Sequence, residues 1–422
     1  MTEKISPLGE ALKVTGRLLR SGRVPGQLII QYTDRCNATC PQCGMRVTND
    51  FARTTLAEQR VAEMIRHAAD HGVAALSFTG GEPFMCLDEV CRLATVAGAH
   101  KIPYIRTGTN GYLFRGAENA DFSDRMKTLA DKLSATPLRN IWVSIDSSDV
   151  DTHEQMRGLP GVIKGVEKAL PIFAERGLYL SANLGINRNF SGRDKDRDHL
   201  DYPFFRAGFD RFYRFVTELG FTIANVCYPM HGDDDSDQAV YAATATDRVV
   251  SFTYEEKLNL FQALSDAIPG HRQNIRIFTP RCSLHALLQQ YRGREELTTP
   301  CRGGIDYFFV DSQTGHSYPC GYRGDEDLGR FEEMTPPSCS AAQECRRCDW
   351  ECFRDPTELF SPLLDLRLAP GRLMQRLWKD RTFYRLWRED LRYYRACEFF
   401  DGRRNLDREK LRLWRNPVLP SP

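Results

Sequence analysis

Short β-rich runs alternate with amphipathic helical patterns between residues 27 and 230, and this order constrains the fold more than any other feature. The runs with strand character lie at 27–33, 73–79, 102–107, 140–146, 178–186 and 221–228. Helical patterns lie between them, near 55–71, 86–100, 117–135, 161–176 and 201–219. Such alternation predicts parallel βαβ units. The predicted fold class is therefore α/β, with a partial (β/α)6 TIM-like barrel whose functional residues gather at the carboxyl ends of the strands.

The chain divides into four predicted parts. A helical lead-in (1–26) precedes the partial barrel (27–280), which a helix near 253–268 and a strand near 274–279 complete. A small cysteine-rich domain (281–356) and a C-terminal amphipathic helical segment (357–422) follow. Within the barrel, the acidic, small-residue stretch 232–246 is interpreted as a solvated loop, because it has no spacing typical of metal ligands.

Composition excludes several classes of protein. The 422 residues are 41% hydrophobic and 27% charged, which is typical of a soluble globular protein. The net charge of +1 argues against a generally basic nucleic-acid binder. No apolar run is long enough to span a bilayer, and the N-terminus has no secretory h-region. We therefore expect a cytoplasmic protein.

Fourteen cysteines are many for a cytoplasmic protein, and their clustering is informative. Three of them, Cys36, Cys40 and Cys43, form a C-x3-C-x2-C pattern directly after the first predicted strand. Three thiolates on one loop can bind three irons of a [4Fe–4S] cluster and leave the fourth iron open for a reactant. A structural zinc site normally needs four ligands, and no second pair lies nearby. Cys86, Cys91 and Cys227 lie in helical or strand patterns and are predicted to be buried as small apolar side chains.

Two further motifs accompany this cysteine loop. Thr79-Gly80-Gly81-Glu82-Pro83 ends the second predicted strand, and Val143-Ser144-Ile145-Asp146 ends the fourth. Together with the C-x3-C-x2-C pattern, they resemble the radical S-adenosylmethionine (SAM) superfamily over about residues 27–190. The resemblance implies an enzyme that cleaves SAM reductively at an iron–sulfur cluster to form a 5′-deoxyadenosyl radical. The radical then takes a hydrogen atom from a substrate.

The resemblance also implies which residues contact SAM. Gly80, Gly81 and Glu82 correspond to the edge that binds the methionine amino group, and Ser144 and Asp146 to residues near the ribose and carboxylate. Arg157 pairs with the SAM carboxylate or is a surface arginine at a helix start. Asn183 and Asn187 face SAM or are strand-end turn residues, and Thr109-Asn110-Gly111 resembles a third-strand motif of the same relatives. Gln42 departs from the family, which usually has an aromatic residue there, so SAM packing is expected to differ.

A second cysteine group lies in the cysteine-rich domain. Cys301-x13-Gly315-x4-Cys320, followed by Cys345-x2-Cys348-x3-Cys352, resembles the SPASM or shorter twitch modules of radical SAM enzymes. The resemblance implies one auxiliary [4Fe–4S] cluster held by Cys301, Cys320, Cys345 and Cys348. Cys352, Cys339 and Cys282 are alternative ligands, a second auxiliary cluster is not excluded, and structural zinc is the competing interpretation.

The C-terminal segment is basic and aromatic. Leu373, Leu377, Tyr384, Trp387, Leu391 and Tyr394 recur at three- and four-residue intervals among many arginines. This pattern predicts an amphipathic helix. It either packs on the barrel with its arginines toward solvent, or contacts an acidic partner or an anionic membrane surface, which would make the protein peripheral.

The sequence leaves the substrate open. A small molecule, a lipid and a ribosomal peptide all fit; the peptide-binding domain that often precedes the barrel in peptide-modifying relatives is not expected in the 26 residues before the first strand. The auxiliary cluster would transfer electrons or bind the substrate, and a flavodoxin or ferredoxin would supply electrons. We expect no nucleic-acid partner. The alternative is a non-catalytic zinc- or iron–sulfur-binding interaction protein.

Overall fold

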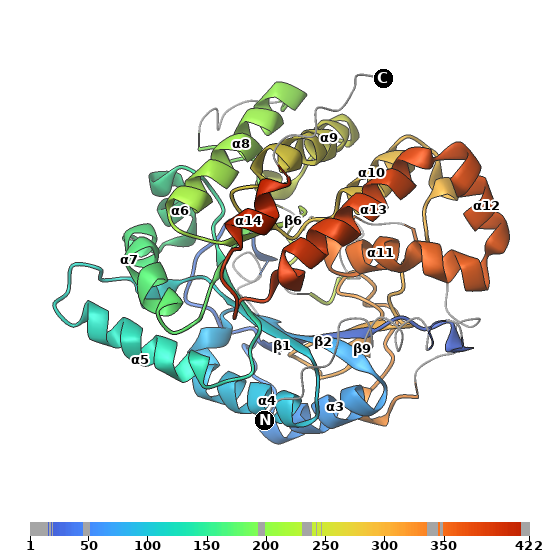
Figure 1. Cartoon of the computed structure of the whole chain (residues 1–422). Coiled ribbons are helices and arrows are strands. Elements are labelled where there is room, and N and C mark those ends of the chain that lie inside the picture. Colours follow the sequence, from blue (N-terminus) through green and yellow to red (C-terminus); the bar gives the residue numbers. More distant parts are fainter. Residues whose placement is uncertain are drawn as a thin grey trace.

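The computed structural model describes residues 16, 18, 20–44, 51–192, 199–229, 239–241, 243–245, 247–335, 345, 346 and 349–414. Their strands form one sheet, with helices around it (Figure 1), and the strand order is β7-β6-β5-β4-β3-β2-β1-β8-β9. The first seven are β1 (Gly26–Thr33), β2 (Val73–Gly80), β3 (Tyr104–Thr109), β4 (Asn140–Ser144), β5 (Ser181–Gly185), β6 (Ile223–Cys227) and β7 (Arg276–Ile277). Neighbours among these seven pair in parallel. The predicted α/β fold with an open, partial barrel is confirmed.

Helices connect successive strands, as the alternating pattern predicts. They are α3 (Glu58–Asp70), α4 (Leu87–Ala99), α5 (Phe122–Ser134), α6 (Val150–Arg157), α7 (Val162–Ala174), α8 (Tyr202–Glu218) and α9 (Tyr254–His271). Local chemistry fixes where several begin. Thr253 and Glu256 form a reciprocal capping box at the start of α9, and Asp201 accepts a hydrogen bond from Phe204 N at the start of α8. The sequence pattern did not indicate α6.

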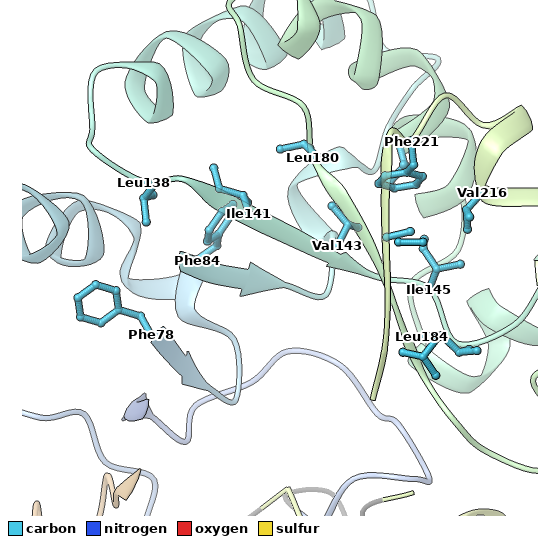
Figure 2. Packing of buried hydrophobic residues seen from close by; sticks show 14 of the residues in the cluster. Phe78, Phe84, Leu138, Ile141, Val143, Ile145, Leu180, Leu184, Val216 and Phe221 are labelled. Atoms are coloured by element: carbon cyan, nitrogen blue, oxygen red, sulfur yellow. The ribbon is translucent and has the colours of Figure 1, made fainter. Parts of the chain in front are cut away.

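The two faces of the sheet differ in character. Apolar residues on one face, among them Val143 and Leu184, pack in the large core between strands and helices (Figure 2). The alternate positions face the inside of the curved sheet and are largely polar. On β4, β5 and β6 the last inward positions, including Ser144, Asn183 and Cys227, are only partly buried, whereas their outward neighbours are fully buried. Solvent therefore reaches the inner face near the carboxyl ends of these strands.

The cysteine-rich domain extends the same sheet. β8 (Tyr307–Val310) pairs in parallel with β1 on the side opposite β2, and β9 (Ser317–Tyr318) pairs antiparallel with β8. These strands were not predicted, since this region of the sequence shows little periodicity. It also contributes α10 (Arg281–Tyr291) and α11 (Glu351–Leu368), which runs across residue 356. The predicted domain boundaries remain predictions.

The C-terminal segment forms α12 (Pro370–Lys379), α13 (Arg381–Ala396) and α14 (Arg408–Arg412), so the single amphipathic helix predicted there is wrong. Asp380 interrupts it, accepting a hydrogen bond from Phe383 N and pairing with His285 on α10 at 2.8 Å. α13 packs against α10, with Phe383 and Leu386 buried. Among the described helices, none has the length and apolar character needed to cross a bilayer.

Candidate functional site

The first cysteine group lies on the loop that directly follows β1. Cys36 is exposed, Cys43 is half-buried and Cys40 is buried, and none of the three is in a disulfide. The end of α6 holds this loop in place, because Thr39 N donates to the carbonyl oxygen of Arg157 at 3.0 Å. Burial raises the pKa of Cys40 to about 12, and it also raises the pKa of Cys36. A metal group bound here must therefore displace thiol protons.

The two glycines at the end of β2 pack against the start of this loop. Gly81 N donates to the carbonyl oxygen of Thr33 at 2.7 Å, and Glu82 N donates to that of Arg35 at 2.8 Å. A Cβ atom at Gly80 would overlap the carbonyl oxygen of Thr33, and one at Gly81 would overlap that of Arg35. Only glycine lets the two segments approach so closely.

Glu82 connects β2 to the end of β3. Its buried carboxylate accepts hydrogen bonds from Phe84 N at 2.9 Å and from Asn110 N at 2.5 Å. Burial raises the pKa of Glu82 to about 7. The side chain of Asn110 in turn lies 3.8 Å from the sulfur of Cys36 and donates to Asn37 at 2.9 Å. The ends of β2 and β3 thus lie beside the cysteine loop.

Asp146 and Arg157 form a buried ion pair on the other side of the loop. Arg157 Nη2 lies 2.7 Å from Asp146 Oδ2, and Gln42 Nε2 donates to the same oxygen at 2.5 Å. Arg157 lies in the last turn of α6 and is 8% exposed, so the alternative of a surface arginine at a helix start is wrong. Gln42, noted in the sequence only as a departure from the family, links the cysteine loop to Asp146.

Three buried polar atoms beside this ion pair have no hydrogen-bond partner among the described residues: Gln42 Oε1, His153 Nε2 and Arg157 Nε. His153 Nδ1 accepts from Asp146 N at 3.0 Å, so its proton resides on Nε2. Buried polar groups are nearly always satisfied, and these orphans therefore fit a polar ligand. A ligand with carboxylate and hydroxyl groups, as in SAM, has the matching chemistry.

Asn183 and Asn187 lie in different surroundings. Asn187 Nδ2 donates to the carbonyl oxygen of Asp146 at 2.9 Å. Asn183 Oδ1 instead accepts from Asn225 Nδ2 at 2.8 Å and from Cys227 Sγ at 3.3 Å. Ser144 is aligned with Asn183 on the neighbouring strand and is partly exposed toward the inside of the barrel.

Tyr241 is a site residue that sequence reasoning missed. Its hydroxyl lies 3.1 Å from Thr79 Oγ1 at the end of β2, and its ring packs 5.2 Å from that of Phe309. Tyr241 falls in the stretch predicted to be a solvated loop, whose acidic residues (231–238) lie outside the described residues. An aromatic side chain among small residues was the one signal in the sequence.

Three cysteines of the second group lie close together in the structure. Cys301, Cys320 and Cys345 line one small cavity together with Arg323 and Arg354. Cys301 N donates to the carbonyl oxygen of Cys345 at 2.8 Å. Cys348 and the alternative Cys339 lie outside the described residues. Cys352 is not among the residues that line this cavity.

Cys282, the other alternative, lies elsewhere. Its backbone N–H donates to Asp390 Oδ2 at 2.8 Å, and its side chain packs with Phe383 and Leu386 of α13. Over the part of the chain that the structure describes, no three Cys, His, Asp or Glu side chains are close enough to hold one metal ion.

The family model of the Radical SAM superfamily matches residues 30–189, which span the cysteine loop, β2–β5 and the Asp146–Arg157 pair. Residues 30–189 of this chain form a radical SAM domain. The domain implies a [4Fe–4S] cluster and SAM as cofactors. Buried orphan atoms and clustered thiols on this chain fit that pair of groups.

The enzyme is similar to two curated relatives over most of its length. It is 24% identical over 303 residues to the AdoMet-dependent heme synthase of Methanosarcina barkeri, covering 71% of this chain and 77% of the relative. It is also 24% identical over 353 residues to that of Oleidesulfovibrio alaskensis, covering 81% and 80%. Among solved structures, Streptococcus suis SuiB bound to its precursor peptide SuiA matches with 17% identity and a TM-score of 0.52, covering 83% of this chain and 76% of SuiB. The latter likeness concerns the fold.

Proposed function

We propose that this enzyme cleaves SAM reductively at a [4Fe–4S] cluster held by Cys36, Cys40 and Cys43. When bound, the cluster supplies one electron that splits SAM into methionine and a 5′-deoxyadenosyl radical, which takes a hydrogen atom from a substrate. One observation carries this proposal: three cysteines share the loop directly after β1, beside a buried ion pair with unsatisfied polar atoms. Three ligands leave one iron open for SAM.

The chain's own residues orient SAM in this proposal. Arg157 holds the methionyl carboxylate through the guanidinium atoms that Asp146 does not use. Gly80, Gly81 and Glu82 bind the amino group, and Ser144 faces the ribose. Asn183 is the least supported of the predicted SAM contacts, because its side-chain oxygen already accepts two hydrogen bonds on the β6 side.

The cysteine-rich domain is proposed to hold one auxiliary [4Fe–4S] cluster with Cys301, Cys320, Cys345 and Cys348 as ligands. The shared cavity of the first three supports this ligand set over one that includes Cys282 or Cys352. Its role is proposed to be electron transfer or substrate binding. A flavodoxin or ferredoxin is the proposed reductant.

A tetrapyrrole is the first substrate class that we propose. The matches to the heme synthases cover 71% and 81% of this chain, whereas the match to the probable GTP 3′,8-cyclase of Pyrococcus abyssi covers 40% of it. A peptide is the second candidate, supported by a 27% identity over 164 residues to the PqqA peptide cyclase of Granulibacter bethesdensis. Binding assays with a carboxylated porphyrin and with an unstructured peptide separate the two.

Anaerobic reconstitution tests the central proposal. Two cubanes would bring iron and sulfide to about eight per chain, and one cubane to about four. Incubation with SAM and a strong reductant should release 5′-deoxyadenosine, and Cys40→Ala should abolish this release. Cys320→Ala is the matched control, because it should lose auxiliary iron and still release 5′-deoxyadenosine. Zinc without iron in the folded protein would instead support the non-catalytic interaction protein.

A further inference from the structure

Two thiols and a carboxyl group meet on the inner side of the sheet, apart from the two proposed cluster sites. Cys227 is the last residue of β6, and Glu351 and Cys352 begin α11. Cys352 Sγ lies 3.5 Å from Glu351 Oε1, and the other carboxylate oxygen accepts from Tyr228 N at 3.2 Å. Glu351 therefore lies beside Tyr228, the residue that follows Cys227 in the chain.

Neither thiol fits the role of a structural cysteine. Cys227 and Cys352 are partly exposed, unlike Cys86 and Cys91, which are buried as the sequence predicts. The prediction that Cys227 is a buried apolar side chain is therefore wrong. Cys227 belongs to the partly exposed inward positions at the carboxyl ends of β4, β5 and β6. Catalytic groups in barrels of this type gather at that end of the strands.

Tyr241 connects this group to the first cysteine loop. Its hydroxyl contacts Thr79 and lies within electrostatic reach of Cys43, Cys352 and Cys227. Cys227 also donates to Asn183, which is aligned with Ser144, so it borders the inner space that these two proposed SAM contacts face. A substrate that enters this space to meet a SAM-derived radical also meets the thiols.

Both sulfur atoms carry protons in this environment. Burial, and secondarily the charge of Glu351, raises the pKa values of the Cys227 and Cys352 thiols well above the usual 9.0. Burial also raises the pKa of Glu351. The structure thus holds intact S–H bonds beside a carboxyl group that exchanges protons. An S–H bond is weaker than most C–H bonds, so a carbon radical takes hydrogen from it readily.

We propose that Cys227 donates a hydrogen atom to the carbon radical formed on the substrate, and that Glu351 returns a proton to the sulfur. This inference rests on the proposed function. The S–H bond of Cys227 breaks, a C–H bond forms on the substrate, and a thiyl radical remains. One electron from the flavodoxin- or ferredoxin-class donor and one proton from Glu351 restore the thiol, and water reprotonates Glu351. Cys352 also contacts the Glu351 carboxyl and helps to hold that carboxyl in position.

The test uses the holoenzyme with SAM and dithionite in D2O, without substrate and without added thiol. Thiol hydrogens exchange with D2O, whereas C–H hydrogens do not. The 5′-deoxyadenosyl radical then takes deuterium from Cys227, and mass spectrometry of 5′-deoxyadenosine should show one deuterium in the native enzyme. Cys227→Ser should lower the deuterated fraction to less than half, because a serine O–H is too strong to donate. The fraction is measured per 5′-deoxyadenosine formed, so a variant that only works more slowly does not show a lower deuterated fraction.

Three variants complete the experiment. Cys91→Ser, which removes a buried thiol on α4, should leave the deuterated fraction unchanged. Tyr241→Phe should also leave it unchanged, since the donor is sulfur. An equal deuterated fraction in the native enzyme and Cys227→Ser would overturn the inference, and so would its loss in Tyr241→Phe alone. Absence of 5′-deoxyadenosine from every variant, including the native enzyme, would instead refute the proposed function.

Discussion

At the scale of single residues, the Asp146–Arg157 ion pair anchors the cysteine loop to the barrel. Both side chains are buried, and Gln42 ties the pair to the loop. Asp146→Asn should lower the free energy of unfolding by about 3–5 kcal/mol, because the Arg157 charge stays buried without its carboxylate. Urea unfolding followed by fluorescence measures this loss.

An ion pair on the surface serves as the control for this loss in the free energy of unfolding. Glu58 and Arg92 form an exposed ion pair at 2.7 Å. Glu58→Gln should cost less than about 1 kcal/mol, since solvent screens the pair. Equal losses in the two variants would show that the Asp146–Arg157 pair is no more than a surface ion pair.

Glu82 gives the fold a pH dependence. Burial raises its pKa from the usual 4.5 to about 7, so native Glu82 keeps a proton that the unfolded chain has released. The free energy of unfolding should fall as pH rises from 4.5 to 7, by at most about 3 kcal/mol, and then level off. Glu82→Gln should lose this part of the pH profile, as measured by urea unfolding of the cluster-free protein. Parallel profiles for the two proteins would contradict the raised pKa.

Residue types and spacing predicted which residues lie together, and their role in binding SAM and a cluster stays a prediction. Cys36, Cys40, Glu82 and Asp146 lie around one loop as their motifs imply. The partners of Asn183 could not be predicted, because Asn225 and Cys227 belong to a strand with no motif. Gln42 was visible only as a mismatch to a family pattern.

At the scale of elements, the end of β2 fixes the position of the cysteine loop. Gly81→Ala places a Cβ against the carbonyl oxygen of Arg35, backbone that can move only with the loop. This variant should therefore retain less iron after reconstitution and release less 5′-deoxyadenosine. Gly270→Ala on α9 is the matched control, because its Cβ meets no atom within 4 Å, and it should behave as the native enzyme. A full iron content in Gly81→Ala would contradict this account of the glycines.

α12 carries an exposed apolar surface, and its contact with a membrane stays a prediction. Met374, Leu377 and Trp378 are 66%, 43% and 77% exposed, and Lys379 and Arg381 lie next to them in sequence. α12 projects at the right edge of Figure 1, away from α5 and α7. The proposed contact is with an anionic membrane surface.

Vesicle sedimentation tests this contact. Trp378→Ala should reduce binding to phosphatidylserine-containing vesicles severalfold, because it removes the largest exposed apolar side chain of α12. Leu413→Ala changes an equally exposed apolar residue near the C-terminus and should leave binding unchanged. Equal binding by the native enzyme and Trp378→Ala would mean that this surface does not bind lipid.

At the scale of the whole molecule, one sheet joins the barrel and the cysteine-rich domain. β8 pairs with β1, so the strand that leads into the cysteine loop also borders the module with Cys301 and Cys320. The order of strands β1 to β6 followed from alternation in the sequence. The pairing of β8 could not be predicted, because a strand of four residues without periodicity is defined only by its contacts with a neighbouring strand.

Long-range packing also explains what sequence reasoning missed in the barrel interior. Tyr241, Glu351 and Cys352 reach the inner side of the sheet from segments that follow the last predicted strand of the alternation. Their functional partners, Thr79 and Cys227, lie more than a hundred residues earlier. A local sequence pattern cannot predict contacts between residues so far apart in the chain.

The most direct test of the account is the electron paramagnetic resonance spectrum of the reduced, reconstituted Cys320→Ala enzyme. This variant should retain the cluster on Cys36, Cys40 and Cys43 as its one complete cubane. Addition of SAM should shift the g values of its [4Fe–4S]+ signal, because SAM binds the open iron. A cluster signal that SAM leaves unchanged at saturating concentration would contradict the claim that these three thiols form the SAM site.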